Sequence, residues 1–234
     1  FLLRELGALG TLKSAMGDVE GELEVILTRI REQLDGLERA RDSAVRLSRD
    51  LVKLSGKVVT CVISGELAGL VELLRKLEEA KSALASLVSE RPALLYGGPI
   101  VSALAEYAEA RILHDLVVLG KLPSELELSV PPASFLLGLC DVIGELRRLS
   151  LEHVRAGRLS EAWSALDLME IIFSNVSTLD YPEAVVPGLR HKIDLARRLV
   201  DDTKTLLVEL DSREKLERAL RSMKETINRL GPST

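Results

Sequence analysis

Hydrophobic residues recur every three or four positions along nearly the whole chain, which is the spacing of one face of an α-helix. No segment alternates polar and apolar residues as a β-strand does, and no hairpin dipeptide joins two apolar runs. The pattern is interrupted at Gly17 and Gly21, Ser64-Gly65, Arg91-Pro92, 96–99, 120–132, Gly157, 180–182, Pro187-Gly188 and Gly231-Pro232. These interruptions predict an all-α fold, an antiparallel bundle of about seven helices in a single domain over residues 1–234.

One predicted helix, near residues 41–61, has two distinct faces. Its apolar stripe advances in steps of three and four residues and consists of Ala44, Leu47, Leu51, Leu54, Val58 and Cys61. The roughly opposite face carries the basic residues Arg46, Arg49, Lys53 and Lys57. The segment 41–57 has five basic and two acidic residues, although the whole chain has a net charge of −5. A basic face of this kind either contacts nucleic acid or is simply solvated.

The last predicted helix is long and extends over residues 187–230. Its apolar seam consists of Leu189, Ile193, Ala196, Val200, Thr203, Leu207 and Leu210, and it resumes after a shift near Asp211 with Leu216, Leu220, Met223, Ile227 and Leu230. A helix of about 40 residues is about 60 Å long, which exceeds the width of a compact domain of this size. We therefore expect part of this helix to pack against another subunit of an oligomer.

Two other helices are too apolar for surface helices, yet each carries a narrow polar stripe. In residues 99–120 the stripe is Ser102, Glu106 and Glu109, and in the helix that begins near Ser134 it is Gly138, Asp141, Glu145 and Arg148. Like charges at these spacings repel one another even on an exposed helix. In a partly dry setting the repulsion grows unless a cation neutralises it.

Four carboxylates without clustered His or Cys favour a hard divalent cation such as Mg²⁺, with Mn²⁺ as a substitute, over zinc. Such an ion can activate water and stabilise charge on a phosphodiester, which reconciles an acidic site with an anionic substrate. A structural interpretation is also open, because glutamates on helices are usually solvated. Glu145 could pair with Arg148, and Glu109 could pair with Arg111 or with a lysine elsewhere.

The amino-acid composition limits which classes of protein remain possible. Apolar residues make up 47% of the chain and aromatic residues only 3%, so the core must consist mainly of Leu, Val, Ile and Ala. No stretch reaches the ~20 uncharged apolar residues of a membrane span, and Glu5 lies where a signal peptide would be apolar. Cys61 and Cys140 lack CxxC spacing, which favours free thiols. We expect a soluble, cytoplasmic protein.

Several blocks of the sequence resemble the translin/Trax family, and together they cover about residues 36–210. The early helix of Trax is similar to RDSAVRLSRDLVKLSGKVVTCV, and the central motif of translin and Trax is similar to SFLLGLCDVIGELRRLSLEHVRAGRLSEA. The segment EYAEA resembles the Trax Glu-aromatic-x-Glu-Ala motif, which assigns catalytic roles to Glu106 and Glu109. The segment CDVIGEL resembles the Trax Ala-Asp-Leu-Thr-Gly-Glu-Leu motif, which adds Asp141 and Glu145.

The resemblance implies a Trax-like, catalytically competent and archaeal member of the family. It further implies a translin-like seven-helix protomer, a closed octameric shell with sites facing its cavity, and Mg²⁺-dependent cleavage of single-stranded or processed RNA. The stretch ALLYGGPIVSALA has no basic residue where translin is rich in His and Arg. The candidates for phosphate contacts are therefore Arg46, Arg49, Lys53, Lys57, Arg147 and Arg148, with His153, Arg155 and His191 less favoured.

Three functional hypotheses follow. In the first, Glu106, Glu109, Asp141 and Glu145 hold one or two Mg²⁺ ions and the protein is an endoribonuclease. In the second, the protein is a homo-oligomeric shell that binds single-stranded RNA or DNA without catalysis. In the third, it is a helical scaffold in which the carboxylates form structural ion pairs.

Overall fold

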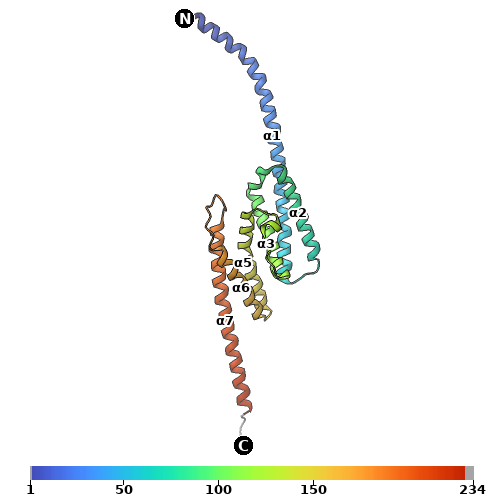
Figure 1. Ribbon diagram of the computed structural model, residues 1–234, viewed down its shortest axis with the longest axis vertical. Helices are drawn as coiled ribbons and strands as arrows, with labels where there is room; N and C mark the ends of the chain where they lie inside the picture. Colours follow the sequence, from blue (N-terminus) through green and yellow to red (C-terminus); the bar gives the residue numbers. More distant parts are fainter. Residues whose placement is uncertain (1, 230–234) are drawn as a thin grey trace. The chain divides into compact units, whose positions relative to one another are not determined.

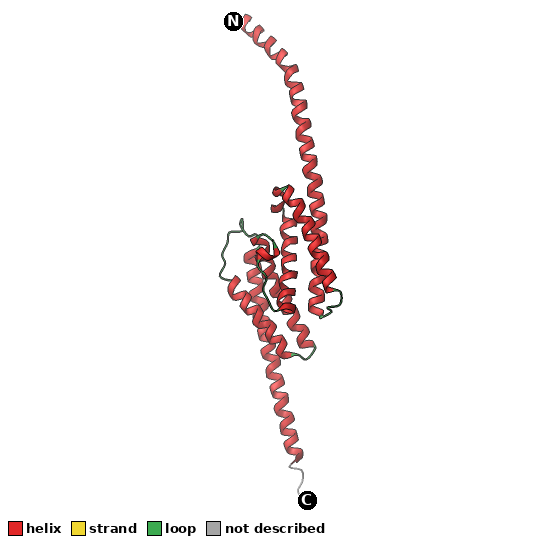
Figure 2. Ribbon diagram, turned by 45° about the vertical axis from the view of Figure 1, so that its right-hand side comes forward, coloured by secondary structure: helices red, strands yellow, loops and turns green. Residues whose placement is uncertain are grey.

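The computed structural model describes residues 2–229, with side chains for residues 19–95, 97–226 and 228. Within residues 2–229 it has seven α-helices and no β-strand, as the hydrophobic pattern predicts (Figure 2). The helices are α1 (Leu2–Ser64), α2 (Leu70–Glu90), α3 (Gly98–His114), α4 (Glu125–Leu128), α5 (Pro132–Arg155), α6 (Leu159–Val176) and α7 (Leu189–Arg229). A 3-10 turn, η1 (Pro92–Tyr96), precedes α3, and a π-helical turn, η2 (Asp115–Leu119), follows it.

The ends of the helices follow from proline and glycine. Proline occupies the first turn of η1, α3 and α5, where its missing N–H costs no helical hydrogen bond. Gly65, Gly120, Gly157 and Gly188 have positive φ values next to helix ends, a conformation that side chains rarely adopt. These positions match the predicted interruptions.

The interruption predicted at Gly17 and Gly21 is wrong, because α1 continues from residue 2 to residue 64. An isolated glycine costs a helix only about 1 kcal/mol relative to alanine. The helix predicted near residues 41–61 is therefore the C-terminal part of α1.

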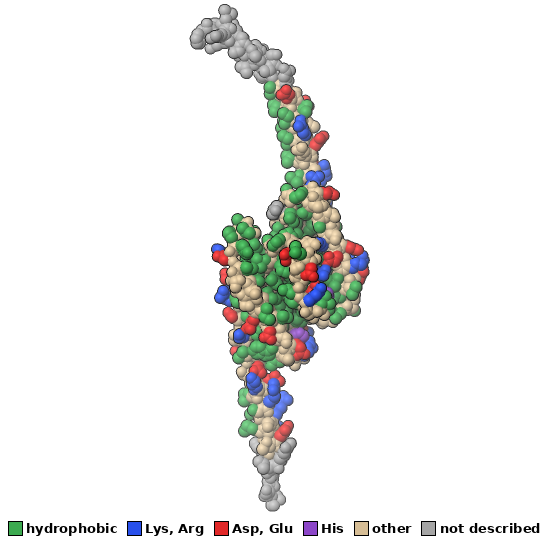
Figure 3. Space-filling model, viewed as in Figure 1, with side chains coloured by type: hydrophobic (Ala, Val, Ile, Leu, Met, Phe, Trp, Pro, Cys, Tyr) green, Lys and Arg blue, Asp and Glu red, His purple; other side chains and the backbone are tan. Residues whose placement is uncertain are grey.

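The chain separates into two compact units, residues 1–46 and residues 47–234, and α1 contributes to both. The first unit is a single helical segment. Its exposed apolar residues include Leu23, Ile26, Ile30, Leu34 and Leu37, which follow one another at steps of three and four. Figure 3 shows these apolar side chains gathered along one side of the described part of this helix, with charged side chains beside them. This stripe has the spacing of a packing face.

The second unit is built around α5. This helix packs against α3, α6 and α7, and α6 also packs against α7 (Figure 1). The three-residue turn around Gly157 returns the chain so that α6 runs antiparallel to α5. α3 is buried on nearly all sides, as its apolar sequence predicts. The side chains of α3 and α5 that face each other therefore lie inside the bundle.

The part of α1 that belongs to the second unit buries a stripe slightly different from the predicted one. Leu51 and Val58 are fully buried, whereas Leu47, Leu54 and Cys61 are only half-buried. The stripe is completed by two buried serines, Ser48 and Ser55, whose polarity hides them from a search for apolar positions. The stripe member Ala44 belongs to the first unit.

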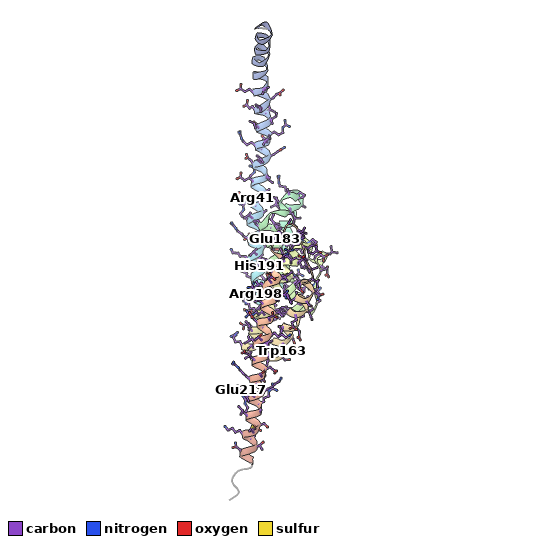
Figure 4. The ribbon with its side chains drawn as sticks, turned by 90° about the vertical axis from the view of Figure 1, so that its left-hand side faces the viewer. Arg41, Trp163, Glu183, His191, Arg198 and Glu217 are labelled. Carbon is purple, nitrogen blue, oxygen red and sulfur yellow. The ribbon has the colours of Figure 1, made fainter. Side chains whose placement is uncertain are left out.

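α7 begins and ends within two residues of its predicted limits. The first six residues of the predicted seam, from Leu189 to Leu207, are buried, and Leu210 is half-buried. In the second half, Leu216, Leu220 and Met223 are exposed, and the side chains of Ile227 and Leu230 lie outside the described residues. Figure 4 labels His191, Arg198 and Glu217 in this order along the helix. No described helix is long and apolar enough to cross a membrane.

Candidate functional site

The crossing of α3 and α5 is unusually close at Gly138. A Cβ atom placed there would lie 2.5 Å from the backbone oxygen of Ala105 and 2.9 Å from the backbone nitrogen of Glu109. One turn earlier, the Ser134 hydroxyl donates a hydrogen bond to the carbonyl oxygen of Val101 over 3.2 Å. Two small residues on α5 thus let the backbones approach, and this close approach sets the spacing of the side chains that follow.

The four candidate carboxylates lie at this crossing. Glu106 and Glu109 come from α3, and Asp141 and Glu145 come from the turns of α5 that follow Gly138. Glu109 is only 9% exposed, and the side chains of Asp141 and Glu145 are 27% and 22% exposed. Acidic residues are seldom buried to this extent without a partner of opposite charge.

The carboxylates influence one another electrostatically. Burial, followed by the charges of Asp141, Glu106 and Glu145, raises the pKa of Glu109 from 4.5 to about 8. Burial and the charges of Asp141 and Glu145 also raise the pKa of Glu106. The structure therefore brings the four side chains into one acidic cluster.

A cation from outside α3 and α5, Lys192, reaches the cluster from the first turn of α7. Its ammonium group donates to both carboxylate oxygens of Asp141, with Nζ 2.5 Å from Oδ2. Its charge lowers the pKa of Glu106 and of Glu109 but does not cancel the effect of the other carboxylates. The sequence analysis did not single out Lys192. The available signal was its place beside the buried seam, between Leu189 and Ala196.

The structural ion pairs considered from the sequence are partly present. Arg148 does pair with Glu145, over 3.2 Å on the exposed side of α5. Arg111 does not pair with Glu109; it contacts Glu78 of α2 and lies 3.8 Å from Asp115. Among the described residues no lysine or arginine forms an ion pair with Glu106 or Glu109. Of the three glutamates, only Glu145 therefore has a described basic residue as its ion-pair partner.

A second buried polar network lies beside the cluster. The Tyr107 hydroxyl donates to Glu78, which also accepts from Arg111. His114 and Asp115, both buried, are 2.7 Å apart between Nδ1 and Oδ1. This network ties α2 to α3 and η2, and it holds the helix that carries Glu106 and Glu109.

The donor set suits a hard divalent cation, because it offers carboxylate oxygens with an excess of negative charge. Among the described side chains, however, no three acidic, histidine or cysteine residues are arranged to hold a metal ion as they stand. In addition, the ammonium group of Lys192 already donates to both oxygens of one donor, Asp141. The chemistry of the site fits such an ion, and the position of Lys192 competes with it.

The predicted phosphate-binding residues lie on two helices. Arg49, Lys53 and Lys57 are exposed on α1, and Arg46 is exposed in the first unit. On α5, Arg148 is exposed, whereas Arg147 is half-buried and its Nε atom has no hydrogen-bond partner. Arg49, Lys53 and Lys57 follow one another at intervals of four, so they share one face of α1.

A polar pocket that the sequence analysis missed continues this basic face. It lies where the end of α1 meets the end of α5, and it is lined by Thr60, Ile63, Ser64, Arg148, Glu152, Arg155, Ala156 and Arg158. Arg155 pairs with Glu152, and Arg158 is within 3.2 Å of the Nδ1 atom of His153. Only the fold brings Thr60 and Ser64 next to Arg155 and Arg158, which explains why the sequence did not reveal the pocket. His191 is exposed on α7.

The family of this chain follows from its match to a family model. The family model described as the translin family matches residues 22–207, which is well over half of the chain. The chain belongs to the translin family. All four carboxylates, Lys192 and the basic residues of α1 and α5 lie within the matched range.

Solved structures agree with this translin-family assignment. The chain is similar to AfC3PO, with 29% identity and a TM-score of 0.72, over 80% of this chain and 97% of that chain. A solved complex of AfC3PO with duplex RNA matches with 28% identity and a TM-score of 0.73 over the same shares. The structure of apo-NeC3PO, at 21% identity, has a TM-score of 0.71 over 78% of this chain and 95% of that chain, which supports the fold alone.

The chain is also similar to an uncharacterised protein of Methanocaldococcus jannaschii. The two sequences are 28% identical over 186 residues, which span 77% of this chain and 82% of the relative. The similarity therefore extends over most of both chains.

Proposed function

We propose that this translin-family protein is a Mg²⁺-dependent endoribonuclease that works inside a homo-oligomeric shell. The observation that carries the proposal is the acidic cluster at the α3–α5 crossing, where Asp141 pairs with Lys192 and Glu145 with Arg148, while Glu106 and Glu109 have no basic partner among the described residues. Buried charge without a partner is unfavourable unless a ligand neutralises it. A bound divalent cation would neutralise it.

Each carboxylate has a role in this proposal. Glu106 and Glu109 would hold the cation from α3, and Asp141 and Glu145 would hold it from α5. A Mg²⁺ ion supplies water activation and charge stabilisation at a phosphodiester when it is bound. Glu109 would release its proton on binding, because a carboxyl must be ionised to act as a ligand.

The basic residues outline a path for RNA. The exposed face with Arg49, Lys53 and Lys57 leads along α1 to Thr60 and Ser64, which line the polar pocket together with three arginines of α5 and the turn that follows it. Arginine and hydroxyl groups are the usual partners of backbone phosphates. We infer that the strand follows this face, with Arg148 linking the pocket to Glu145 of the cluster.

The substrate class is supported by the similarity to AfC3PO, for which a complex with duplex RNA has been solved. Aromatic residues make up only 3% of this chain, so base stacking should contribute little and sequence preference should be weak. Single-stranded or processed RNA, including the ends of duplex RNA, is the proposed substrate, and single-stranded DNA is a further candidate ligand.

The homo-oligomer, proposed to be an octamer, is supported by exposed apolar seams. Leu216, Leu220 and Met223 on α7 continue a seam whose first half is buried, yet they are more than half exposed in a single chain. The first unit carries a similar exposed stripe. Other copies of the chain would cover such surfaces in a shell.

The decisive variant is Asp141→Asn, which keeps the shape of the side chain and removes its charge. We expect Mg²⁺-dependent cleavage of a labelled single-stranded RNA to fall at least ~100-fold, which corresponds to ~3 kcal/mol of transition-state stabilisation. Circular dichroism and gel filtration should show the fold and the assembly unchanged. Asp180→Asn is the matched control, because Asp180 is an exposed partner of Arg190 far along the chain from the cluster. Equal cleavage by wild type and Asp141→Asn would remove the site assignment.

The second candidate is an RNA-binding shell without catalysis. It is favoured by the lysine that already neutralises Asp141 and by the absence of a ready metal-binding geometry among the described side chains. Binding of the same RNA in EDTA and in Mg²⁺ separates the two candidates. Equal binding under both conditions, with no cleavage products, would favour the non-catalytic shell.

A further inference from the structure

The cation that the acidic cluster already contains is part of the protein. Lys192 lies in the first turn of α7, four residues after Gly188, whose positive φ directs the chain into the helix. Its side chain is 29% exposed and that of Asp141 is 27% exposed. The pair therefore lies at the edge of the cluster, with one side accessible to solvent.

Most of the hydrogen-bonding capacity of the Lys192 ammonium group is directed to Asp141. Two of its three N–H donors are directed to the two oxygens of the same carboxylate. A divalent cation that binds Asp141 would have to use one of these oxygens and would lie beside the ammonium charge. Like charges at that separation repel strongly in a partly desolvated site.

One ammonium group is also insufficient for the cluster. Lys192 pairs with Asp141 alone, and Glu109, which is only 9% exposed, has no basic partner among the described residues. The carboxylates of α3 are therefore available to a further cation, although Lys192 already occupies Asp141.

We propose that Lys192 is a built-in counter-ion that occupies Asp141 in the metal-free protein and must leave it when a divalent cation binds. This inference rests on the proposed function, since it assumes that the cluster is a cation site. Lys192 would lower the affinity for the metal and would keep the α3–α5 crossing intact in its absence. Once released, its flexible stem and three donors would be available to a phosphate group of the substrate. Lys192 is thus a positioning residue that couples metal binding to substrate binding.

The first test measures Mn²⁺ affinity without RNA by electron paramagnetic resonance. We expect Lys192→Met to bind Mn²⁺ at least ~10-fold more tightly than wild type, and Lys192→Arg, which keeps the charge, to stay within ~3-fold of wild type. Lys204→Met is the matched control, because Lys204 lies on the same helix as Lys192 but forms an exposed ion pair with Glu170 of α6. It should leave Mn²⁺ affinity unchanged. Lys192→Met binding that is no tighter than wild type would overturn the inference.

A second measurement uses the unmodified protein and does not depend on the folding of a variant. Brief acetylation of lysine amines, read by mass spectrometry, should label Lys192 several-fold faster in saturating Mn²⁺ than in EDTA. Labelling of Lys204 should not change. Equal labelling of Lys192 in the two conditions, at Mn²⁺ concentrations where binding is observed, would contradict its displacement.

The outcomes separate this inference from the proposed function. If wild type binds Mn²⁺ and cleaves RNA but Lys192→Met binds no more tightly, only the role of Lys192 fails. If Lys192→Met binds Mn²⁺ and wild type neither binds it nor cleaves RNA, Lys192 blocks the site and the proposed nuclease function fails. If neither protein binds Mn²⁺, both proposals are wrong.

Discussion

Two groups of acidic side chains in this protein have opposite surroundings. In the second half of α7, four acidic residues each pair with a basic residue one turn later, as in Arg221–Glu217 at 3.2 Å and Lys215–Asp211 at 2.6 Å. These side chains are largely exposed. At the α3–α5 crossing, four carboxylates influence one another, Glu109 is buried, and only Asp141 and Glu145 pair with a described basic residue, Lys192 and Arg148.

The difference distinguishes acidic side chains that stabilise a helix from acidic side chains that are available to bind a ligand. An exposed pair one turn apart contributes a few tenths of a kcal/mol to a helix and is weakened by salt. Such pairs account for the soluble surface of α7. In the acidic cluster Glu145 is the only carboxylate with such a local partner among the described residues, and perturbed carboxyls in a partly buried site are characteristic of functional sites. The cluster is therefore where a ligand from solution is expected.

The largest expected effect comes from Glu109→Gln. Cleavage of RNA should fall ~100-fold or more, because a cation ligand is lost. The metal-free variant should nevertheless be more stable than wild type. The pKa of Glu109 is about 8 in the folded protein and about 4.5 in the unfolded chain. Between these two pH values the Glu109 carboxyl is therefore protonated in the folded protein and ionised in the unfolded chain. The stability of wild type therefore falls as the pH rises through this window.

The gain in stability of Glu109→Gln over wild type should consequently be small at pH 4 and largest above pH 8. Thermal melting in EDTA at pH 4, 6 and 9 measures it. Glu217→Gln on α7 is the matched control, and it should change stability by less than ~0.5 kcal/mol and leave cleavage unchanged. A Glu109→Gln protein that is less stable than wild type at pH 9 would show that the cluster is already neutralised.

A smaller effect is expected from Gly138→Ala, which tests the geometry of the crossing. The new methyl group would lie 2.5 Å from the backbone oxygen of Ala105, so α3 and α5 would have to move apart. We expect a loss of ~1–3 kcal/mol in the free energy of unfolding, as for other overpacked sites, together with weaker Mn²⁺ binding. Urea unfolding measures the first effect.

Gly144→Ala, two turns further along α5, is the control for this substitution. Its methyl group would meet only the Leu199 side chain, at 3.7 Å. The variant should be as stable as wild type or slightly more stable, because alanine favours a helix by up to about 1 kcal/mol over glycine. If both alanine variants behaved alike, the close approach at Gly138 would not be what positions the cluster.

Much of this architecture could be predicted from the sequence because apolar residues on the buried face of a helix recur every three or four positions. The seam of α7 from Leu189 to Leu207 and the buried character of α3 followed directly from apolar spacing. Glu106, Glu109, Asp141 and Glu145 were recognisable because charge is conspicuous on an otherwise apolar helix. Neighbouring turns of one helix are fixed by its geometry, so each pair of carboxylates could be placed on a common face.

The remaining features depend on contacts between distant segments. Lys192 meets Asp141 across 51 positions in sequence, and no local pattern encodes that meeting. Ser48 and Ser55 are buried by packing, although their polarity indicated exposure. The continuity of α1 through Gly17 and Gly21 shows a further limit, because a glycine marks a helix end only when the surrounding structure requires one there.

A crystal structure grown with Mn²⁺ tests the central claim most directly, since anomalous scattering locates the ion without reference to activity. We expect Mn²⁺ within about 2 Å of carboxylate oxygens from both α3 and α5, with the ammonium group of Lys192 turned away from Asp141. Crystals in which Lys192 still holds Asp141 and no Mn²⁺ lies between Glu109 and Asp141, at an ion concentration well above that needed for cleavage, would contradict the account.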